Sequence, residues 1–429
     1  LGGITMGTGS ILVSGFALFA MFFGAGNLIF PPYLGMTGGS QWIAGFLSFF
    51  LVEILSCVGI HAMLHGGGSI RAMQKSVGAA PGAVLNAAAI LCTGVFIAPP
   101  RTAATTYEMA IQPLTDKLDL LPFSILFFAV VLLLTIRPTR VVDIVGRCLT
   151  PVLILGILVL ILAGILHPIG PIEPPVSPNI IQDGLLAGYQ AMDIISVAGF
   201  AVIIQDTLAQ SGLSTWPQQR RHVAGTACVA GFLLALVYSG LTYLGATAGV
   251  FLDRGLDQAG LIVAITHQLL GRFGVIVLAI VVGFACLTTS IGLFGATASY
   301  FQRITHGRLS YRVNIVILSV IGCAICNLGL STIIEAASPI LSVICPPFMT
   351  TVVLLFFQDY IHRAGLYKGA ALGATAASLL LALHSYFKLF PLAEYLPFYD
   401  YGFGWLIPAI AGGVLGWLLS KPDSASAEP

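Results

Sequence analysis

Long apolar runs alternate with short polar connections along nearly the whole chain. Each run is close to the roughly twenty residues that cross a bilayer as a helix. We count twelve candidate spans at residues 9–35, 42–64, 82–107, 121–137, 142–166, 184–206, 223–249, 260–301, 312–328, 331–357, 368–389 and 403–420. The eighth run is long enough to continue beyond the membrane as helix. The pattern therefore predicts an all-α polytopic membrane protein with about twelve transmembrane helices.

The composition excludes several other classes of protein. Hydrophobic residues make up 57% of the chain and charged residues 8%, whereas a soluble domain carries about 25% charged residues. A transmembrane β-barrel would show alternating segments of about ten residues in place of continuous apolar runs. The net charge of +1 gives no basic surface for nucleic acid. We find no HExxH, P-loop or paired catalytic carboxylates in the spans, so we expect neither an enzyme nor an organic cofactor.

The distribution of Lys and Arg predicts the orientation. With a cytoplasmic N-terminus, thirteen basic residues fall on the cytoplasmic side and five on the other. The cytoplasmic set is Arg71, Lys75, Arg137, Arg140, Arg147, Arg220, Arg221, Arg303, Arg308, Arg312, Arg363, Lys368 and Lys421. The opposite set is Arg101, Lys117, Arg254, Arg272 and Lys388. This bias follows the positive-inside rule and places both termini in the cytoplasm.

The first span is interrupted near its middle. Gly24-Ala25-Gly26-Asn27 follows an apolar stretch, and Pro31-Pro32 comes shortly after it. Glycine leaves the helix backbone unshielded, so its amides and carbonyls can be offered to a ligand. Such a break must be buried in protein or line a cavity, which is how secondary transporters build their sites. The alternative is close helix packing, which Gly-x-Gly also permits.

The sixth span has a similar layout. Residues 188–193, GYQAMD, lead into an apolar stretch in which Ser196, Gly199 and Phe200 mark a possible second break. Two halves of five spans, residues 9–166 and 184–357, would then form inverted repeats that bring the two broken helices together. Residues 368–420 would supply two accessory helices, and residues 421–429 a polar C-terminal tail.

Three motifs carry a family resemblance that extends over essentially the whole chain. They are GFALFAMFFGAGNLIFPP in the first span, GYQAMD in the sixth, and IAPPRTAATTYE at Ile97–Glu108. These motifs resemble the bacterial branched-chain amino acid:cation symporters. The third departs from the family pattern, because Pro99-Pro100 replaces a single proline preceded by Ala-Ile.

The resemblance implies a function and a fold. It implies Na⁺-coupled import of leucine, isoleucine and valine across the bacterial cytoplasmic membrane by alternating access. It also implies a leucine-transporter-type fold of ten core and two extra helices, forming one transport domain over residues 1–420. We expect membrane lipid as the surroundings and no obligate protein partner.

The substrate is expected at the two breaks. Unpaired amides at the start of a half-helix carry partial positive charge, so Gly24, Ala25 and Gly26 are candidates for the substrate carboxylate. Asn27 either turns its side-chain oxygen to a ligand or caps the helix. In the sixth span we expect Ser196, Ala198 and Gly199 to expose backbone to the amino group. Phe200, together with Ile195, is a candidate for capping the aliphatic side chain.

A cation site is expected where the eighth span carries adjacent hydroxyl groups. Thr288 and Thr289 follow Ala285 by about one turn and offer hard oxygen donors that suit a small cation. The resemblance to the leucine-transporter type of fold assigns the Ala285 carbonyl and both hydroxyls to Na⁺, completed by the carbonyls of Ala20 and Phe23. The alternative is that these hydroxyls bond to their own helix.

Ionisable groups inside the spans are costly and therefore candidates for coupling or gating. Asp193, just before the expected second break, could bind the substrate ammonium or relay a proton, or instead hold the broken helix in place near the outer interface. Glu53 lies in the second span, where the alternative to coupling is a bond to a hydroxyl or backbone group. Arg101 and Glu108 could form an ion pair near the outer end of the third span, either as a gate or with a structural role alone. The competing function is therefore a proton-coupled carrier of aliphatic amino acids in which Asp193 or Glu53 titrates.

Overall fold

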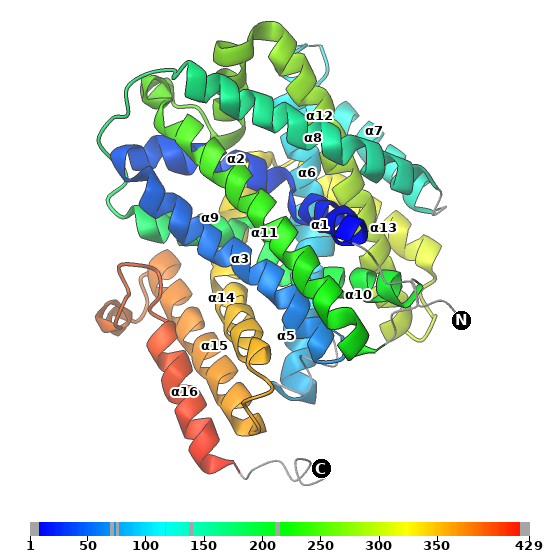
Figure 1. Ribbon diagram of the computed structural model, residues 1–429, viewed down its shortest axis with the longest axis vertical. Coiled ribbons are helices and arrows are strands. Elements are labelled where there is room, and N and C mark those ends of the chain that lie inside the picture. The colour runs from blue at the N-terminus through cyan, green and yellow to red at the C-terminus, as the bar shows by residue number, and fades with distance from the viewer. Residues whose placement is uncertain are drawn as a thin grey trace.

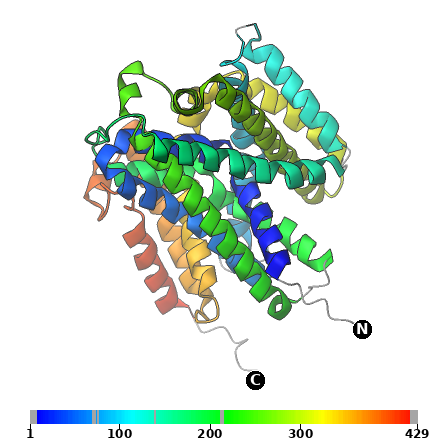
Figure 2. The same cartoon turned by 45° about the horizontal axis from the view of Figure 1, so that its top comes forward.

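The architecture was analysed in a computed structural model that describes residues 8–68, 73, 77–115, 117–136, 140–210 and 215–420. Every regular element within these ranges is a helix, so the predicted all-α class is confirmed. The predicted tail at residues 421–429 lies outside the described residues. The start of α1 and the end of α16 lie on the same side of the bundle (Figure 2), as an even number of spans requires.

The first half of the bundle contains the first five predicted spans. Its helices are α1 (Thr8–Phe22), α2 (Ala25–Gly38), η1 (Gly39–Gln41), α3 (Trp42–His65), α5 (Ala79–Leu91), α6 (Ala98–Thr106), α7 (Leu120–Ile136) and α8 (Arg140–Leu166). The third span combines α5 and α6 with the π-helical turns η2 (Cys92–Phe96) and η3 (Tyr107–Ile111).

The second half contains the next five predicted spans and is followed by an accessory pair. Its helices are α9 (Ile180–Ala191), α10 (Asp193–Gln210), α11 (Trp216–Ala246), η4 (Gly249–Arg254), α12 (Gln258–Ile304), α13 (Tyr311–Cys326) and α14 (Leu330–Phe356). The accessory pair is α15 (Ala364–Phe387), η5 (Pro391–Tyr395) and α16 (Leu406–Leu419), at one edge of the bundle (Figure 1).

Length and composition agree with a membrane location. Seven helical segments are long and apolar enough to cross a membrane, and five shorter apolar helices accompany them among the described residues. Large apolar side chains such as Phe273, Leu133 and Phe232 lie on the outside, with 77%, 71% and 69% of their surface exposed. Such a surface suits contact with lipid chains.

The eighth span differs from the single long helix that the apolar run suggested. Gly271 in α12 has φ 62° and ψ −163°, so the helix kinks there into stretches 258–270 and 272–304. Glycine reaches a positive φ without steric cost. The extra length predicted beyond the membrane is therefore a separate helical stretch set at an angle to the span.

The two halves make reciprocal contacts. Half-helices α1 and α2 pack against α11 of the second half. Half-helices α9 and α10 pack against α3, which is the counterpart of α11 in the first half. The equivalent pairs α3–α11, α6–α12 and α7–α13 also touch. Exchanging the halves reproduces the pattern, as expected for a pseudo-twofold axis, and five spans per half invert one half relative to the other.

Both predicted interruptions exist, but each lies slightly earlier in the chain than expected. Helix α1 ends at Phe22, Gly24 is extended at φ −109° and ψ −167°, and α2 begins at Ala25. Residues 25–27 therefore form the first turn of the second half-helix. In the sixth span the interruption is Met192, which takes the left-handed conformation at φ 67° and ψ 10°.

The predicted position of the second break, around Ser196 and Gly199, is wrong. Ser196, Ala198, Gly199 and Phe200 are interior residues of α10, and the Ser196 hydroxyl donates to the Met192 carbonyl at 2.9 Å. A membrane helix keeps its backbone bonds unless another group replaces them. Arg101 supplies that replacement just before the break, by donating from Nη1 to the Gln190 carbonyl.

Small residues bring α2 and α11 into close contact beside the first interruption. A Cβ atom on Gly35 would lie 1.9 Å from the Thr242 carbonyl oxygen, and one on Gly245 would lie 1.9 Å from the Pro32 carbonyl oxygen. Neither backbone atom can move aside as a flexible side chain would. These glycines therefore fix the position of α2, and with it the first interruption.

We expect Gly245→Ala to destabilise the fold by about 1–3 kcal/mol, because the added methyl group overpacks the α2–α11 contact. The matched control is Gly292→Ala in α12, where no atom lies within 4 Å of the new methyl group. The control should be neutral or stabilising by up to about 1 kcal/mol from helix propensity. Thermal unfolding in detergent measures both, and equal melting temperatures would contradict the packing argument.

Candidate functional site

The two interruptions meet around a small cavity at the centre of the bundle. Its walls come from the last turn of α1, the first turn of α2, both sides of Met192, and parts of α6 and α12. The cavity has a volume of about 30 Å³, which is room for about two water molecules. The site is therefore nearly closed in this conformation.

The first turn of α2 faces this cavity. Gly24 caps the helix without a side-chain hydrogen bond, so the first amides of α2 carry unshielded partial positive charge. A Cβ atom on Gly26 would lie 3.0 Å from Arg101 Nη2 and 3.3 Å from Ala191 Cα. Glycine at this position therefore allows the second interruption and a guanidinium group to approach the helix start.

Asn27 connects the two interruptions. Its side chain is 1% exposed, and Nδ2 donates to the Phe22 carbonyl at 2.8 Å and to Asp193 Oδ2 at 2.7 Å. The first bond caps the end of α1, and the second reaches the start of α10. The Tyr238 hydroxyl also lies against Nδ2, while the buried Asn27 Oδ1 has no hydrogen-bond partner.

Asp193 lies after the second interruption, not before it as the sequence suggested, because α9 already ends at Ala191. Its carboxyl group faces that of Glu53 on α3, and both side chains are buried. The Tyr238 hydroxyl donates to Glu53 Oε2 at 3.4 Å. The two carboxyl groups thus belong to one buried polar cluster with Asn27 and Tyr238.

Arg101 occupies a different place from the one predicted. Its side chain is 3% exposed and lies in the bundle centre, with its guanidinium carbon 5.8 Å from the centre of the Phe30 ring. Glu108 instead faces Asp257 at the start of α12. The predicted Arg101–Glu108 ion pair is therefore wrong. Seven residues separate the two positions along the helix by about 10 Å, and the guanidinium group turns toward the second interruption.

Ion pairs are rare in the described part of the chain. The only two join His65 to Asp359 and His384 to Glu394. Neither pair touches the central cavity, so Arg101 and Asp193, which line it, have no described partner of opposite charge at ion-pair distance.

Of the candidate cation residues, only Thr289 lines the central cavity. Ala285 and Thr288 precede it on α12, Ala20 lies in the last turn of α1, and Phe23 directly follows α1. The Thr288 hydroxyl donates to the Phe284 carbonyl at 3.1 Å and the Ala285 carbonyl at 2.9 Å, which is the self-bonded arrangement weighed above. A donating hydroxyl keeps lone pairs that can accept a cation. The last turn of a helix leaves carbonyls without intrahelical amide partners, and Ala20 lies in that turn of α1.

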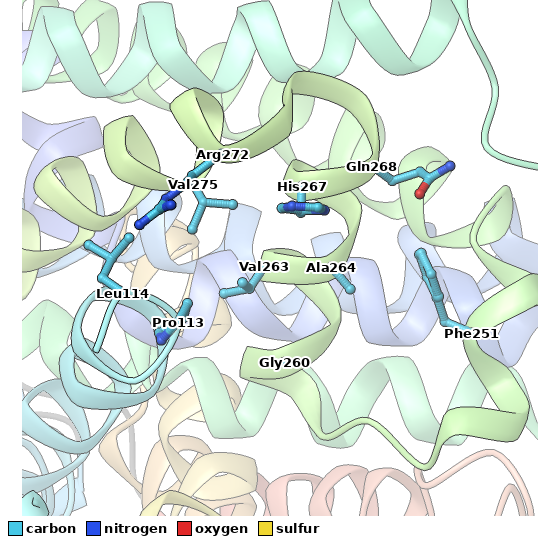
Figure 3. Close-up of a pocket in the computed structure, with 10 residues that line it drawn as sticks. All are labelled: Pro113, Leu114, Phe251, Gly260, Val263, Ala264, His267, Gln268, Arg272 and Val275. Atoms are coloured by element: carbon cyan, nitrogen blue, oxygen red, sulfur yellow. The ribbon is translucent and has the colours of Figure 1, made fainter. Parts of the chain in front are cut away.

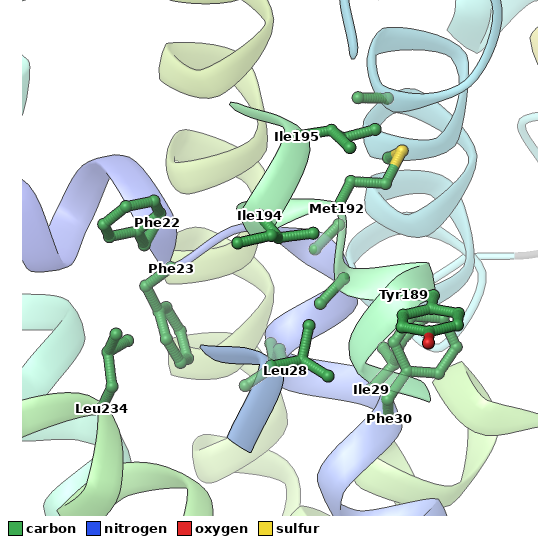
Figure 4. Close-up of a cluster of buried hydrophobic side chains, with 14 of the residues drawn as sticks. Phe22, Phe23, Leu28, Ile29, Phe30, Tyr189, Met192, Ile194, Ile195 and Leu234 are labelled. Atoms are coloured by element: carbon green, nitrogen blue, oxygen red, sulfur yellow. The ribbon is translucent and has the colours of Figure 1, made fainter. Parts of the chain in front are cut away.

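Apolar side chains enclose the polar centre (Figure 4). Phe22, Phe23 and Ile194 are at most 2% exposed and lie around the interruptions. The Phe22 ring meets the Phe200 ring edge to face at 5.5 Å, and both residues line the cavity. Ile195 is 1% exposed but is not part of the cavity wall.

A larger cavity of about 380 Å³ lies elsewhere, between the end of the third span and the kinked part of α12 (Figure 3). Its wall includes Pro113, Leu114, His267 and Arg272. It shares no residue with the central cavity, so it is a separate feature on the side that carries Lys117 and Arg272.

Two residues of the centre, Tyr238 and Gln190, were not predicted from the sequence. Tyr238 stands within an apolar run and carries no local signal of its role. Gln190 belongs to the GYQAMD motif, and it joins the second interruption to α14 by donating from Nε2 to the Ile334 carbonyl at 3.1 Å and to Ser338 Oγ at 2.9 Å. Its place in that motif was the available signal.

The arrangement of the helices matches solved transporter structures. A Na⁺-coupled sialic acid symporter in a substrate-bound outward-open state has a TM-score of 0.64 and 14% identity, covering 96% of this chain and 91% of that chain. The inward-facing conformation of Mhp1 has a TM-score of 0.64 and 13% identity, covering 95% and 90%. The protein thus has the leucine-transporter-type fold, with interrupted first and sixth spans and two accessory helices.

Sequence comparison identifies the family within this class. The profile described as "Branched-chain amino acid transport protein" matches residues 8–422. The "Branched-chain amino acid permease BrnQ" of Bacillus subtilis (strain 168) is 33% identical over 428 residues, which cover 96% of each chain. The chain belongs to the family of branched-chain amino acid transport proteins. It is a multi-pass bacterial membrane transporter and not an enzyme, and the predicted resemblance is confirmed.

We expect Asn27→Leu to destabilise the protein by about 2–5 kcal/mol, because it leaves the Phe22 carbonyl and Asp193 buried without their donor. Tyr238→Phe removes only one hydroxyl from the same cluster and should cost about 1–2 kcal/mol. Melting temperatures in detergent compare the two variants. A larger effect of Tyr238→Phe would show that Asn27 does not hold the interruptions together.

Proposed function

We propose that this protein imports leucine, isoleucine and valine together with Na⁺ across the bacterial cytoplasmic membrane by alternating access. The main support for the proposal is that two interrupted helices meet around one cavity. The start of α2, which has no side-chain cap, forms one wall, and α12 with the Thr289 hydroxyl forms another. The substrate named for the related permeases supports the substrate class.

In this proposal the first turn of α2 binds the substrate carboxylate at Gly24, Ala25 and Gly26. The apolar side chain lies against Phe22 and Phe200. The cavity of about 30 Å³ is too small for an amino acid, so the half-helices α1 and α10 must move apart to admit one. Alternating access supplies this movement.

Sodium binds next to the substrate. Its proposed ligands are the carbonyls of Ala20, Phe23 and Ala285 and the hydroxyls of Thr288 and Thr289. One Na⁺ crossing about 100 mV gains roughly 2.3 kcal/mol, and a tenfold gradient adds about 1.4 kcal/mol. The combined driving force of about 3.7 kcal/mol sustains several hundredfold accumulation of a neutral amino acid, so one Na⁺ per substrate suffices.

Proton coupling is the second candidate, and one observation favours it. The carboxyl groups of Glu53 and Asp193 face each other in the buried cluster. Two carboxyl groups in contact hold one proton between them more readily than they both ionise. In that case the driving ion is a proton bound by these two carboxyl groups and not Na⁺.

The proposal includes a single transport domain over residues 1–420, with repeats at 9–166 and 184–357 and accessory helices at 368–420. Both termini are placed in the cytoplasm by the distribution of basic residues. Arg101 lies inside the bundle and is therefore no longer counted with the external basic residues. Thirteen Lys and Arg residues then fall on the cytoplasmic side and four on the external side.

Uptake of radiolabelled leucine into proteoliposomes tests the function and separates the two driving ions. We expect accumulation with an inward Na⁺ gradient at constant pH, and competition by isoleucine and valine. Accumulation driven by a pH step without Na⁺ would favour the proton-coupled carrier. No accumulation with either gradient would remove the proposal.

The double variant Thr288→Val/Thr289→Val should raise the Na⁺ concentration for half-maximal uptake by about tenfold or more, because it removes two hydroxyl ligands. Thr375→Val on α15 is the matched control, since its hydroxyl also bonds to its own helix, at 2.7 Å from the Ala371 carbonyl oxygen. The control should leave the Na⁺ dependence unchanged. An unchanged Na⁺ dependence in the double variant would exclude this cation site.

A further inference from the structure

Arg101 is buried in the bundle centre without an acidic partner. Its Nη1 donates to the Gln190 carbonyl, whereas its buried Nε has no hydrogen-bond partner. Among the side chains that the structure describes, no carboxylate oxygen lies within the 4.0 Å of an ion pair with Arg101. A buried charge without a counter-ion is costly in a membrane, so this position favours the binding of an anion.

Two sources of positive charge converge where that anion would sit. Arg101 lines the central cavity together with Gly24, Ala25 and Gly26. Its Nη2 lies 3.0 Å from the point where a Cβ atom of Gly26 would be. The uncapped start of α2 therefore adds its partial positive charge to that of the guanidinium group. A planar guanidinium group beside backbone amides suits a carboxylate, which can accept two parallel hydrogen bonds.

An anionic group borders the same cavity. Asp193 is held in place by the hydrogen bond from Asn27 at 2.7 Å. Arg101 and Asp193 are too far apart for an ion pair but close enough for their charges to act on each other. A ligand with a positive and a negative group on adjacent atoms can satisfy both residues at once.

We propose that Arg101 and Asp193 form a charge clamp for the zwitterionic part of the substrate. Arg101 and the start of α2 bind the carboxylate, and Asp193 binds the ammonium group. This inference rests on the proposed function and assigns to Arg101 a binding role in place of a gate. It makes the site selective for α-amino acids over amines or acids with the same carbon skeleton.

The charges of the clamp also indicate how many cations accompany each substrate molecule. When ionised, Arg101, Asp193 and Glu53 carry one net negative charge, and a zwitterion adds none. One monovalent cation per amino acid, either Na⁺ or a proton shared by the two carboxyl groups, then makes the buried centre neutral. This count agrees with the single coupled ion that suffices energetically.

Three ligands with leucine's branched skeleton test the clamp. They are L-leucine, 4-methylpentanoate (leucine without its amino group) and 3-methylbutylamine (leucine without its carboxylate). Binding is measured by ligand-induced thermal stabilisation of the purified full-length protein in Na⁺. The variants are Arg101→Gln, Arg101→Lys and Asp193→Asn, with Arg303→Gln at the exposed end of α12 as the control.

We expect Arg101→Gln to weaken leucine and 4-methylpentanoate by roughly tenfold to hundredfold, the usual range for a hydrogen bond to a charged group. It should leave 3-methylbutylamine unchanged, and Arg101→Lys should recover part of the loss. Asp193→Asn should weaken leucine and 3-methylbutylamine but not 4-methylpentanoate. The control should bind all three like the unsubstituted protein.

An equal loss of all three ligands in Arg101→Gln, or unaltered leucine binding, would overturn the clamp while leaving the proposed function intact. A structural role for Arg101 predicts the first of these results, because general damage does not distinguish a carboxylate from an amine. If the unsubstituted protein neither binds nor transports leucine, the proposed function fails and the clamp fails with it.

Discussion

A helix interrupted inside a membrane must find hydrogen-bond partners for its freed backbone groups in its neighbours, because lipid supplies none. Two residues meet this need here, and each of them contacts both interruptions. Asn27 caps the end of α1 and holds Asp193 at the start of α10. Arg101 satisfies the end of α9 through the Gln190 carbonyl and lies against Gly26 at the start of α2. The two broken helices are therefore mutually dependent, and the cavity exists only where they meet.

The rest of the bundle keeps this meeting point in place. Each broken helix packs on the second helix of the opposite half, so α11 supports the first interruption and α3 supports the second. Gly35 and Gly245 permit the close approach of α2 to α11. The supporting helices also supply Tyr238 and Glu53 to the polar cluster. The packing of α3 and α11 against the broken helices thus also places Glu53 and Tyr238 beside the interruptions.

The residues of the candidate site differ in how far local sequence predicts them. Gly24-Ala25-Gly26 predicts the first break directly, since three consecutive small residues followed by a polar one weaken an apolar helix at that point. The second break was misplaced because Gly199 also predicts a weakened helix. Met192, where the break lies, adopts a left-handed conformation that is not expected of a methionine. Arg101 was assigned to the membrane surface by its position near the end of a predicted span. Its actual partners, Gly26 and Gln190, are remote in sequence.

The class of the protein, its helical segments, the first interruption and the family could all be predicted from the sequence. These follow from apolar run length, composition and local motifs, all of which act within one or two helical turns. Three features depend on the tertiary structure. They are which buried charged groups meet, where α9 ends, and that the Arg101 side chain points to the cavity and away from Glu108. Those outcomes depend on hydrogen bonds between helices far apart in the chain. No local pattern encodes such bonds, because each partner is selected by the geometry of the assembled bundle.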